Sequence, residues 1–135
     1  MIKLDYLSIE IKVQEEIVLV ILIHNDGTIN RKGDGSENLD LPYAMGMGDT
    51  KEIFEKLNPL ITSEFEGCLG KVFDIPEKKG KKCSLAIMLG TDSKATGCRF
   101  MYGLNSMGPP KSVSDFVVKS IELTNAWYQR ANEIA

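Results

Sequence analysis

Apolar and polar residues alternate over residues 7–13, which predicts a strand with one buried and one solvated face. Residues 17–23 follow as an unbroken apolar run. The run is too short to span a membrane and predicts a strand buried on both faces. Residues 25–27, Asn-Asp-Gly, then predict a tight hairpin turn, and residues 28–31 return as a short third strand.

Residues 32–48 are rich in glycine and polar residues and predict a long irregular loop. Loops of this length in a compact domain are often functional. Asp49 and Glu52 then resemble a capping pair at the start of a helix over residues 50–66, in which apolar residues recur at helical spacing. Pro59 predicts that this helix is kinked or divided in two.

The second half of the chain repeats this order. It predicts strands over residues 69–75, 83–89 and 98–104, followed by a helix over residues 112–132. We therefore expect residues 1–135 to form a single α+β domain, with a mainly antiparallel sheet of about six strands and two helices in the order βββα-βββα. In each half the middle strand is the more apolar one, as expected for a three-stranded meander.

The apolar faces of the strands raise a question about cover. Two helices can cover one face of a sheet, yet the strand over residues 17–23 is apolar on both. The second face needs a helix, a second sheet or another subunit, so a homodimer is one of the expected arrangements. The strand over residues 7–13 is polar on one face, which predicts an edge strand or a strand above a solvated patch.

Composition and charge narrow the class of protein. The chain is 43% hydrophobic and 26% charged, as in an ordinary globular domain. The net charge of −3 argues against a nucleic-acid partner, and the lysine-rich residues 78–82 are expected to form a solvated hairpin tip. The first residues lack the apolar run of a signal peptide, so we expect a cytoplasmic protein without a membrane partner.

Cys68, Cys83 and Cys98 are spaced fifteen residues apart. An odd count without a signal peptide argues against a disulfide framework. In a three-stranded meander Cys83 would lie at the opposite end from the other two cysteines, and Cys68 would lie two strands from Cys98, roughly 9–10 Å away. That separation is too great for a disulfide, so three unconnected thiols are expected.

Three further segments resemble sites of chemistry only in part. His24, the only histidine, lies at a strand end beside a turn without an evident nucleophile. Residues 34–40 alternate oxygen-bearing side chains like the start of a calcium loop, but lack the glycine and glutamate that such a loop requires. Residues 90–97 lack the Gly-Lys-Ser/Thr order of a phosphate loop. We therefore expect no catalytic residue, no cofactor and no metal.

Methionine and glycine recur together in the segments that precede the two helices. The first segment contains Tyr43, Met45 and Met47, and the second contains Met107. Methionine is common at adaptable binding surfaces, although these side chains could also fold back over the core. The leading hypothesis is a non-enzymatic module, of a bacterial immunity-like or adaptor type, that binds another protein through these four residues. The alternative is a small-molecule-binding domain or hydrolase-type enzyme that uses the 32–48 loop with Asp34, Asp40 or His24.

Overall fold

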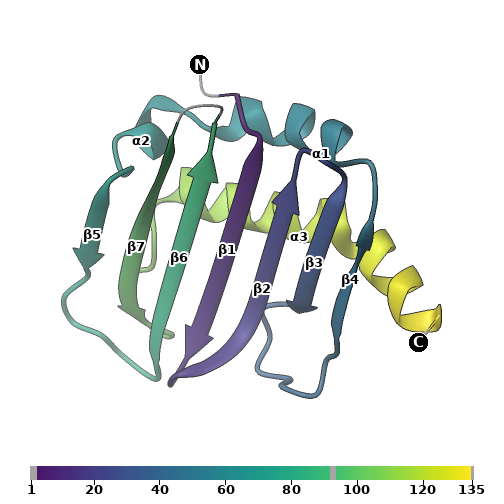
Figure 1. The fold of residues 1–135 in the computed structure, drawn as a ribbon. Helices are drawn as coiled ribbons and strands as arrows, with labels where there is room; N and C mark the ends of the chain where they lie inside the picture. Colours follow the sequence, from purple (N-terminus) through teal and green to yellow (C-terminus); the bar gives the residue numbers. More distant parts are fainter. Residues whose placement is uncertain (1–2, 92–93, 135) are drawn as a thin grey trace.

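The computed structural model describes residues 3–91 and 94–134 and shows an α+β fold built on one mixed sheet (Figure 1). The first half forms strands β1 (Tyr6–Val13), β2 (Glu16–His24), β3 (Thr28–Gly33) and β4 (Tyr43–Met47), followed by helix α1 (Thr50–Leu57), the 3-10 turn η1 (Asn58–Leu60) and helix α2 (Ser63–Glu66). The second half forms β5 (Lys71–Asp74), β6 (Lys82–Gly90), β7 (Ala95–Gly103) and helix α3 (Lys111–Ile134).

The strands lie in the order β4-β3-β2-β1-β6-β7-β5. Strand β2 lies between β1 and β3, as the meander prediction required, and is antiparallel to both. The interpretation of residues 7–13 as an edge strand is wrong, because β1 is the central strand and pairs with β2 and β6. Its second interpretation, a strand above a solvated patch, is confirmed by the half-exposed polar side chains of Ser8, Glu10 and Lys12.

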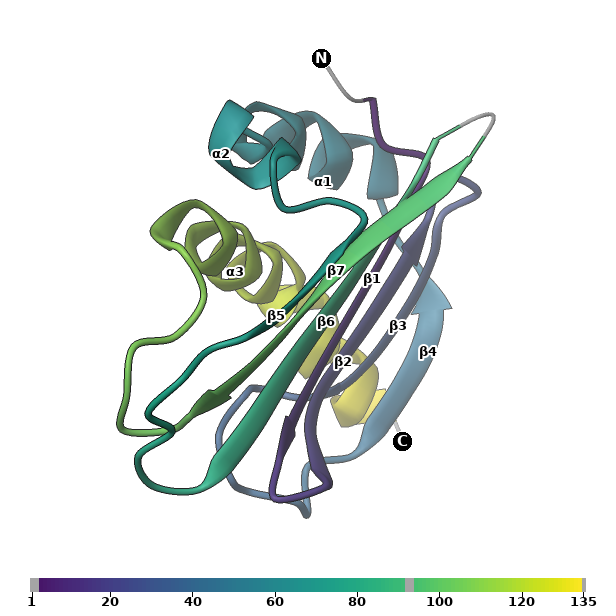
Figure 2. The ribbon, with the colours of Figure 1, turned by 90° about the vertical axis from the view of Figure 1, so that its left-hand side faces the viewer.

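The helices all lie on one face of the sheet, and no element of the described chain covers the other face (Figure 2). Leu19, Ile21 and Ile23 of β2 point toward the helices and are fully buried. Val20 and Leu22 point to the other side and remain half-exposed. The cover that the apolar run predicted for both faces is therefore present on one face only, and we call the other face of the strands the open face.

The predicted helix over residues 50–66 is divided, as Pro59 indicated. The side chain of Asp49 accepts a hydrogen bond from the Glu52 amide at 3.1 Å and starts α1. Pro59 lies in the 3-10 turn η1, and Thr62 caps the short helix α2, which ends at Gly67. The described chain thus has three α-helices rather than two, with the break where proline removes a backbone donor.

The predicted meander of the second half is wrong. Strand β5 pairs with β7 in parallel at one edge of the sheet, and β6 pairs with β1 instead of β5. Strand β5 has only four residues and carries Lys71 and Asp74, which suits an edge. The long apolar β6 lies between β1 and β7. The predicted separation of Cys68 and Cys98 by two strands is wrong for the same reason, because β5 and β7 are adjacent.

The predicted loop over residues 32–48 is also wrong in part, because residues 43–47 form the edge strand β4. Strand β4 alternates large and small residues, and Ala44 and Gly46 point inward. A Cβ atom on Gly46 would lie 3.4 Å from the ring of Trp127, so the helix leaves room only for a small residue there. The extra strand breaks the predicted βββα repeat.

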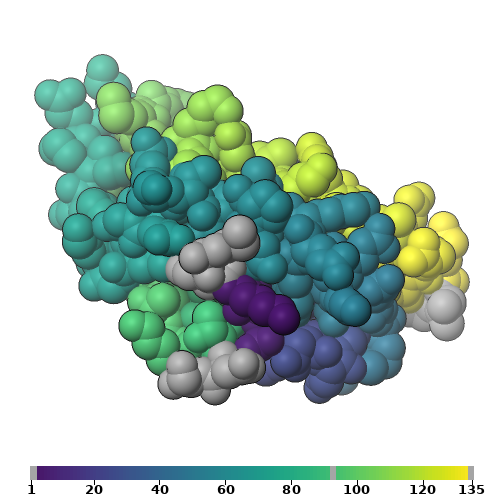
Figure 3. All heavy atoms as spheres, turned by 90° about the horizontal axis from the view of Figure 1, so that it is seen from above, coloured from purple at the N-terminus to yellow at the C-terminus, as the bar shows by residue number. Residues whose placement is uncertain are grey.

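Helix α3 packs across the sheet through a buried stripe of Val113, Phe116, Thr124 and Tyr128. Seen from above, the α1 segment lies across the sheet end and the last turns of α3 project beyond it (Figure 3). None of the helices in the described residues has the length and apolarity needed to cross a membrane.

Candidate functional site

The exposed apolar side chains of β4 are the most prominent feature of the open face. Tyr43, Met45 and Met47 are 58%, 69% and 67% exposed. They lie on one face because alternate residues of a strand point the same way. Val20 and Leu22 of β2 lie two strands away in the same cross-strand rows. Lys32 of β3 pairs with both Val20 and Tyr43, and Asn30 of β3 pairs with both Leu22 and Met45. We call Tyr43, Met45, Met47, Val20 and Leu22 the β4 corner.

Tyr43 is held in place on this surface. Its hydroxyl donates a hydrogen bond of 2.7 Å to the side-chain oxygen of Asn30 on β3. Asn30 is itself buried beneath the β4 corner, between Leu22 on one side and Met45 on the other. The aromatic ring is therefore fixed before any partner arrives, which lowers the entropy cost of binding.

Two aromatic side chains of α3 fasten β4 near its two ends. The indole N–H of Trp127 donates a hydrogen bond of 3.0 Å to the Met47 carbonyl. The Tyr128 hydroxyl accepts from the Gly33 amide at 3.0 Å and donates to the carbonyl of Pro42. Pro42 has no amide hydrogen to donate to β3, so the ladder ends there. The Tyr128 hydroxyl bridges β3 and β4 at that point, because a hydroxyl can both accept and donate.

Arg31 anchors this arrangement from beneath the sheet. Its side chain is 1% exposed, and its guanidinium lies 4.4 Å from the centre of the Tyr128 ring. It donates to the Gly33 carbonyl at 3.0 Å, and to the Ile121 carbonyl and the Thr124 hydroxyl at 3.1 and 3.0 Å. Burial lowers the pKa of Arg31, and the nearby Tyr128 and Asp34 oppose that shift.

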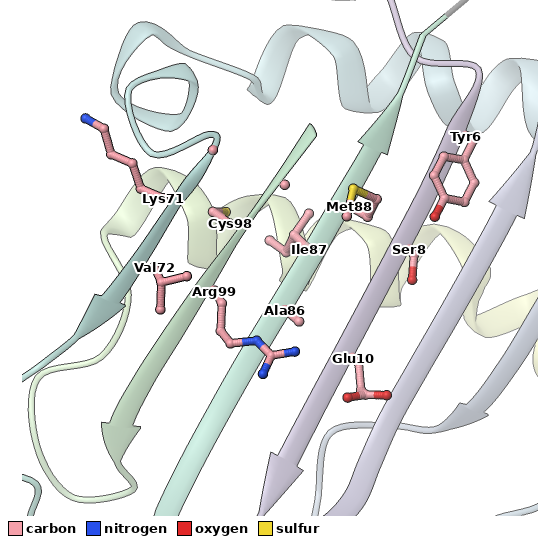
Figure 4. Close-up of a pocket in the computed structure, with 12 residues that line it drawn as sticks. Tyr6, Ser8, Glu10, Lys71, Val72, Ala86, Ile87, Met88, Cys98 and Arg99 are labelled. Carbon is pink, nitrogen blue, oxygen red and sulfur yellow. The ribbon is translucent and has the colours of Figure 1, made fainter. Parts of the chain in front are cut away.

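A second feature of the open face is a shallow hollow of about 550 Å³ over β1, β6 and β7 that extends to Lys71 and Val72 of β5 (Figure 4). Its floor includes Ala86 and Gly97. A Cβ atom on Gly97 would lie 2.3 Å from the Ile87 carbonyl oxygen, so the strands approach too closely for any larger residue. Glu10 and Arg99 lie on opposite sides of Ala86 and give the hollow a charged rim.

Met107 does not join the other predicted partner-binding residues. It is 82% exposed in the segment between β7 and α3, where it lines a hollow with residues 75–77 and Lys79 of the β5–β6 connection. Strands β4 and β5 form opposite edges of the sheet. The sequence hypothesis therefore describes two separate surfaces, one at β4 and one at Met107.

Among the residues of the alternative hypothesis, Asp34 stabilises a turn through its side chain, whereas Asp40 contributes its backbone amide to one. Side-chain oxygens of Asp34, Ser36 and Asn38 each accept a hydrogen bond from the backbone amide two residues later, at 2.9–3.3 Å. The pKa of Asp34 is lowered mainly by its hydrogen bonds from Ser36. His24 lies at the end of β2 against the ring of Tyr6, with 4.9 Å between ring centres. The described residues contain no group of three side chains suited to holding a metal.

The three cysteines are buried free thiols. Burial, together with the nearby Cys68, raises the pKa of Cys98 to about 12. The same cause, burial, raises the pKa values of Cys68 and Cys83. A thiol reacts as its thiolate, so these cysteines react slowly near neutral pH.

Sequence reasoning missed Arg31, Trp127 and Tyr128 as the residues that position the candidate site. A signal for Arg31 was present, because the period of two that points Ile29 toward the core also points Arg31 inward. Helical spacing likewise predicts Trp127 or Tyr128 on the buried stripe of the last helix. No local signal identifies the partner of Trp127 on β4, which is eighty residues away.

Comparison of the chain with protein-family models, with curated proteins and with solved structures finds no match. The arrangement of side chains on the open face is therefore the basis for any functional conclusion.

Proposed function

We propose that this chain is a non-enzymatic module that binds another protein through the β4 corner of its open face. The observation that carries the proposal is the uncovered row of Tyr43, Met45 and Met47, each more than half exposed and none charged. Grouped apolar side chains of this kind typically mark a surface for a partner. Aromatic and methionine side chains are also enriched at the centres of protein interfaces.

The surroundings of the β4 corner support the same proposal. Lys32 lies between Val20 and Tyr43 within the β4 corner. Farther across the open face lie the charged side chains of Glu10, Lys12, Asp74 and Arg99 and the exposed apolar side chains of Val72 and Met88. Protein interfaces combine apolar and aromatic contacts with polar and charged ones in this way. The charged rim of the hollow would supply part of these charged contacts.

A protein partner is favoured over a small molecule because of the shape of this face. Small-molecule sites usually enclose most of their ligand and present a few convergent polar groups. The hollow beside Arg99 is shallow and open, and the described chain has no buried side-chain polar atom that lacks a hydrogen-bond partner. In the 32–48 loop, the side chains of Asp34, Ser36 and Asn38 already bond to the backbone of the same loop.

Site-specific photocrosslinking tests the proposal. A photoreactive benzoylphenylalanine replaces Met45 in one variant and Val118 in a matched control, since Val118 is 52% exposed on α3, on the helix side of the sheet. In cells that produce the protein, the residue at position 45 should crosslink to a discrete partner that the residue at position 118 does not reach. Equal crosslinking at both positions, or none at position 45, would contradict the proposal.

A homodimer remains a prediction, and light scattering on eluting size-exclusion fractions would test it. A single species of the monomer's mass would contradict the homodimer and leave a different protein as the occupant of the open face.

A further inference from the structure

We infer that the partner bound at the β4 corner supplies a short extended segment that pairs with the free edge of β4 as an eighth strand. This inference rests on the proposed function and specifies the form of the partner. The segment that fits is uncharged along its contact row and carries apolar side chains at alternate positions. Its side chains would continue the row of Tyr43, Met45 and Met47 on the open face.

The hydrogen-bond register of β4 shows which backbone groups point outward. The Gly48 amide donates to the Gly27 carbonyl at 2.8 Å, and these residues lie directly opposite each other in the register that pairs Met47 with Thr28. In an antiparallel ladder, bonded and non-bonded pairs alternate. Ala44 and Gly46 therefore bond to β3, whereas the N–H and C=O groups of Tyr43 and Met45 point away from the sheet.

These outward groups are available to a new strand. At one end of β4, the indole of Trp127 donates a hydrogen bond to the outward carbonyl of Met47. At the other end, the Tyr128 hydroxyl donates to the carbonyl of Pro42. In the described residues, no hydrogen bond is formed by the outward backbone groups of Tyr43 and Met45. Strand β4 is thus held at both ends with its centre unpaired, which matches a short docking segment.

The other edge of the same sheet provides a comparison. Strand β5 is shorter, carries Lys71 and Asp74, has an ion pair between Asp74 and Lys78, and is followed by Pro76. Charges, proline and short length are the features by which natural proteins keep edge strands from pairing. Strand β4 has no charge and no proline within its five residues. One edge of the sheet is protected, and the other is left able to pair.

The test uses peptides selected from a display library of random nine-residue sequences against the immobilised protein. The selected peptides should share apolar residues at alternate positions, and one such peptide is then the probe in binding titrations. Met45→Pro removes the outward N–H and leaves the bonds of Ala44 and Gly46 to β3 in place. Met45→Ala removes most of the side chain and keeps the N–H.

Strand pairing predicts that Met45→Pro weakens peptide binding by at least about tenfold relative to Met45→Ala, because a backbone donor is lost and the proline ring obstructs the ladder. Exchange of the Ala44 and Gly46 amides would verify that β4 of the proline variant still pairs with β3. In the wild-type protein, the Tyr43 and Met45 amides should become protected from hydrogen exchange when the peptide is bound, which requires no variant.

Equal binding by Met45→Pro and Met45→Ala, unchanged exchange of the Tyr43 and Met45 amides, or a selection that yields no binder would overturn strand pairing. A protein crosslinked from position 45 that binds both variants equally would leave the proposed function standing, with side-chain contacts in place of a strand. Absence of any crosslinked protein would instead contradict the proposed function.

Discussion

Arg31 shows how a single residue links the core to the candidate site. Its buried guanidinium is bonded to two carbonyls and a hydroxyl, and no carboxylate of the described residues forms an ion pair with it. The charge is therefore stabilised by dipoles and by the Tyr128 ring. These contacts join β3 to α3 directly beneath the strand that carries the exposed methionines.

Replacement of Arg31 should be costly. We expect Arg31→Met to lower the free energy of unfolding by about 2–4 kcal/mol, because buried carbonyls lose hydrogen bonds to a charged donor. Lysine should not restore stability, since it cannot stack on Tyr128 and donate in a fixed plane. Urea unfolding measures the effect, with Lys32→Met as the neighbouring control on the open face. An effect of Arg31→Met below about 1 kcal/mol would contradict this account.

The buried thiols make a second residue-scale prediction. The Cys98 pKa is raised to about 12 from its ordinary value of 9.0, so the folded protein holds this proton more tightly than the unfolded chain. Its contribution to stability is complete below pH 9 and is lost as the pH rises toward 12. The free energies of unfolding of the wild-type protein and of Cys98→Ala should therefore converge between pH 9 and pH 12. A constant difference would contradict the assignment.

At neutral pH the same burial should slow chemical modification. We expect the native protein to react slowly with an aromatic disulfide reagent, and the denatured, unreduced protein to release three equivalents, one for each free cysteine. Fewer than three equivalents after denaturation would indicate a disulfide and would contradict the structure. The measurement also tests the sequence prediction of three unconnected thiols.

At the scale of elements, α3 determines the position of β4. The Tyr128 hydroxyl satisfies a buried amide and a carbonyl at once. We expect Tyr128→Phe to lower the free energy of unfolding by about 1–3 kcal/mol, because both backbone groups lose their partner. Hydrogen exchange should accelerate at Ala44 and Gly46 more than in β1, which lies at the centre of the sheet.

Trp127→Phe provides a milder comparison at the other end of β4. It keeps an aromatic ring beneath Gly46 and removes only the donor to the Met47 carbonyl. Because that carbonyl can bond to water instead, the expected loss is below about 1 kcal/mol. Equal effects of the two variants would contradict the distinction between a buried bridge and an exposed bond.

At the scale of the whole molecule, the sheet is covered on one side only, and this has a measurable consequence in β2. Ile21 points into the core, whereas Leu22 points to the open face. We expect Ile21→Ser to lower the free energy of unfolding by more than about 3 kcal/mol and Leu22→Ser by less than about 1.5 kcal/mol. If a second copy covered the open face, the cost of Leu22→Ser would rise with protein concentration.

Local patterns were sufficient to predict most of the elements. The alternation of residues 7–13, the apolar run 17–23, the turn at residues 25–27, the helix break at Pro59 and the long final helix are all present in the structure. Each depends on interactions between residues close in the chain, such as capping, a fixed proline angle or side-chain period. The α+β class follows from the order of these elements.

The composition of residues 17–23 was enough by itself to predict a strand, and to predict that this strand pairs with another strand on each side. Which strands become edges was decided only by tertiary structure, because the pairing of β6 with β1 joins residues 70 to 84 positions apart. The same is true of β4, whose inward glycine and outward methionines make sense only with Trp127 beneath them. Sequence determined the elements because their causes are local, and the fold determined the candidate site because its contacts are not.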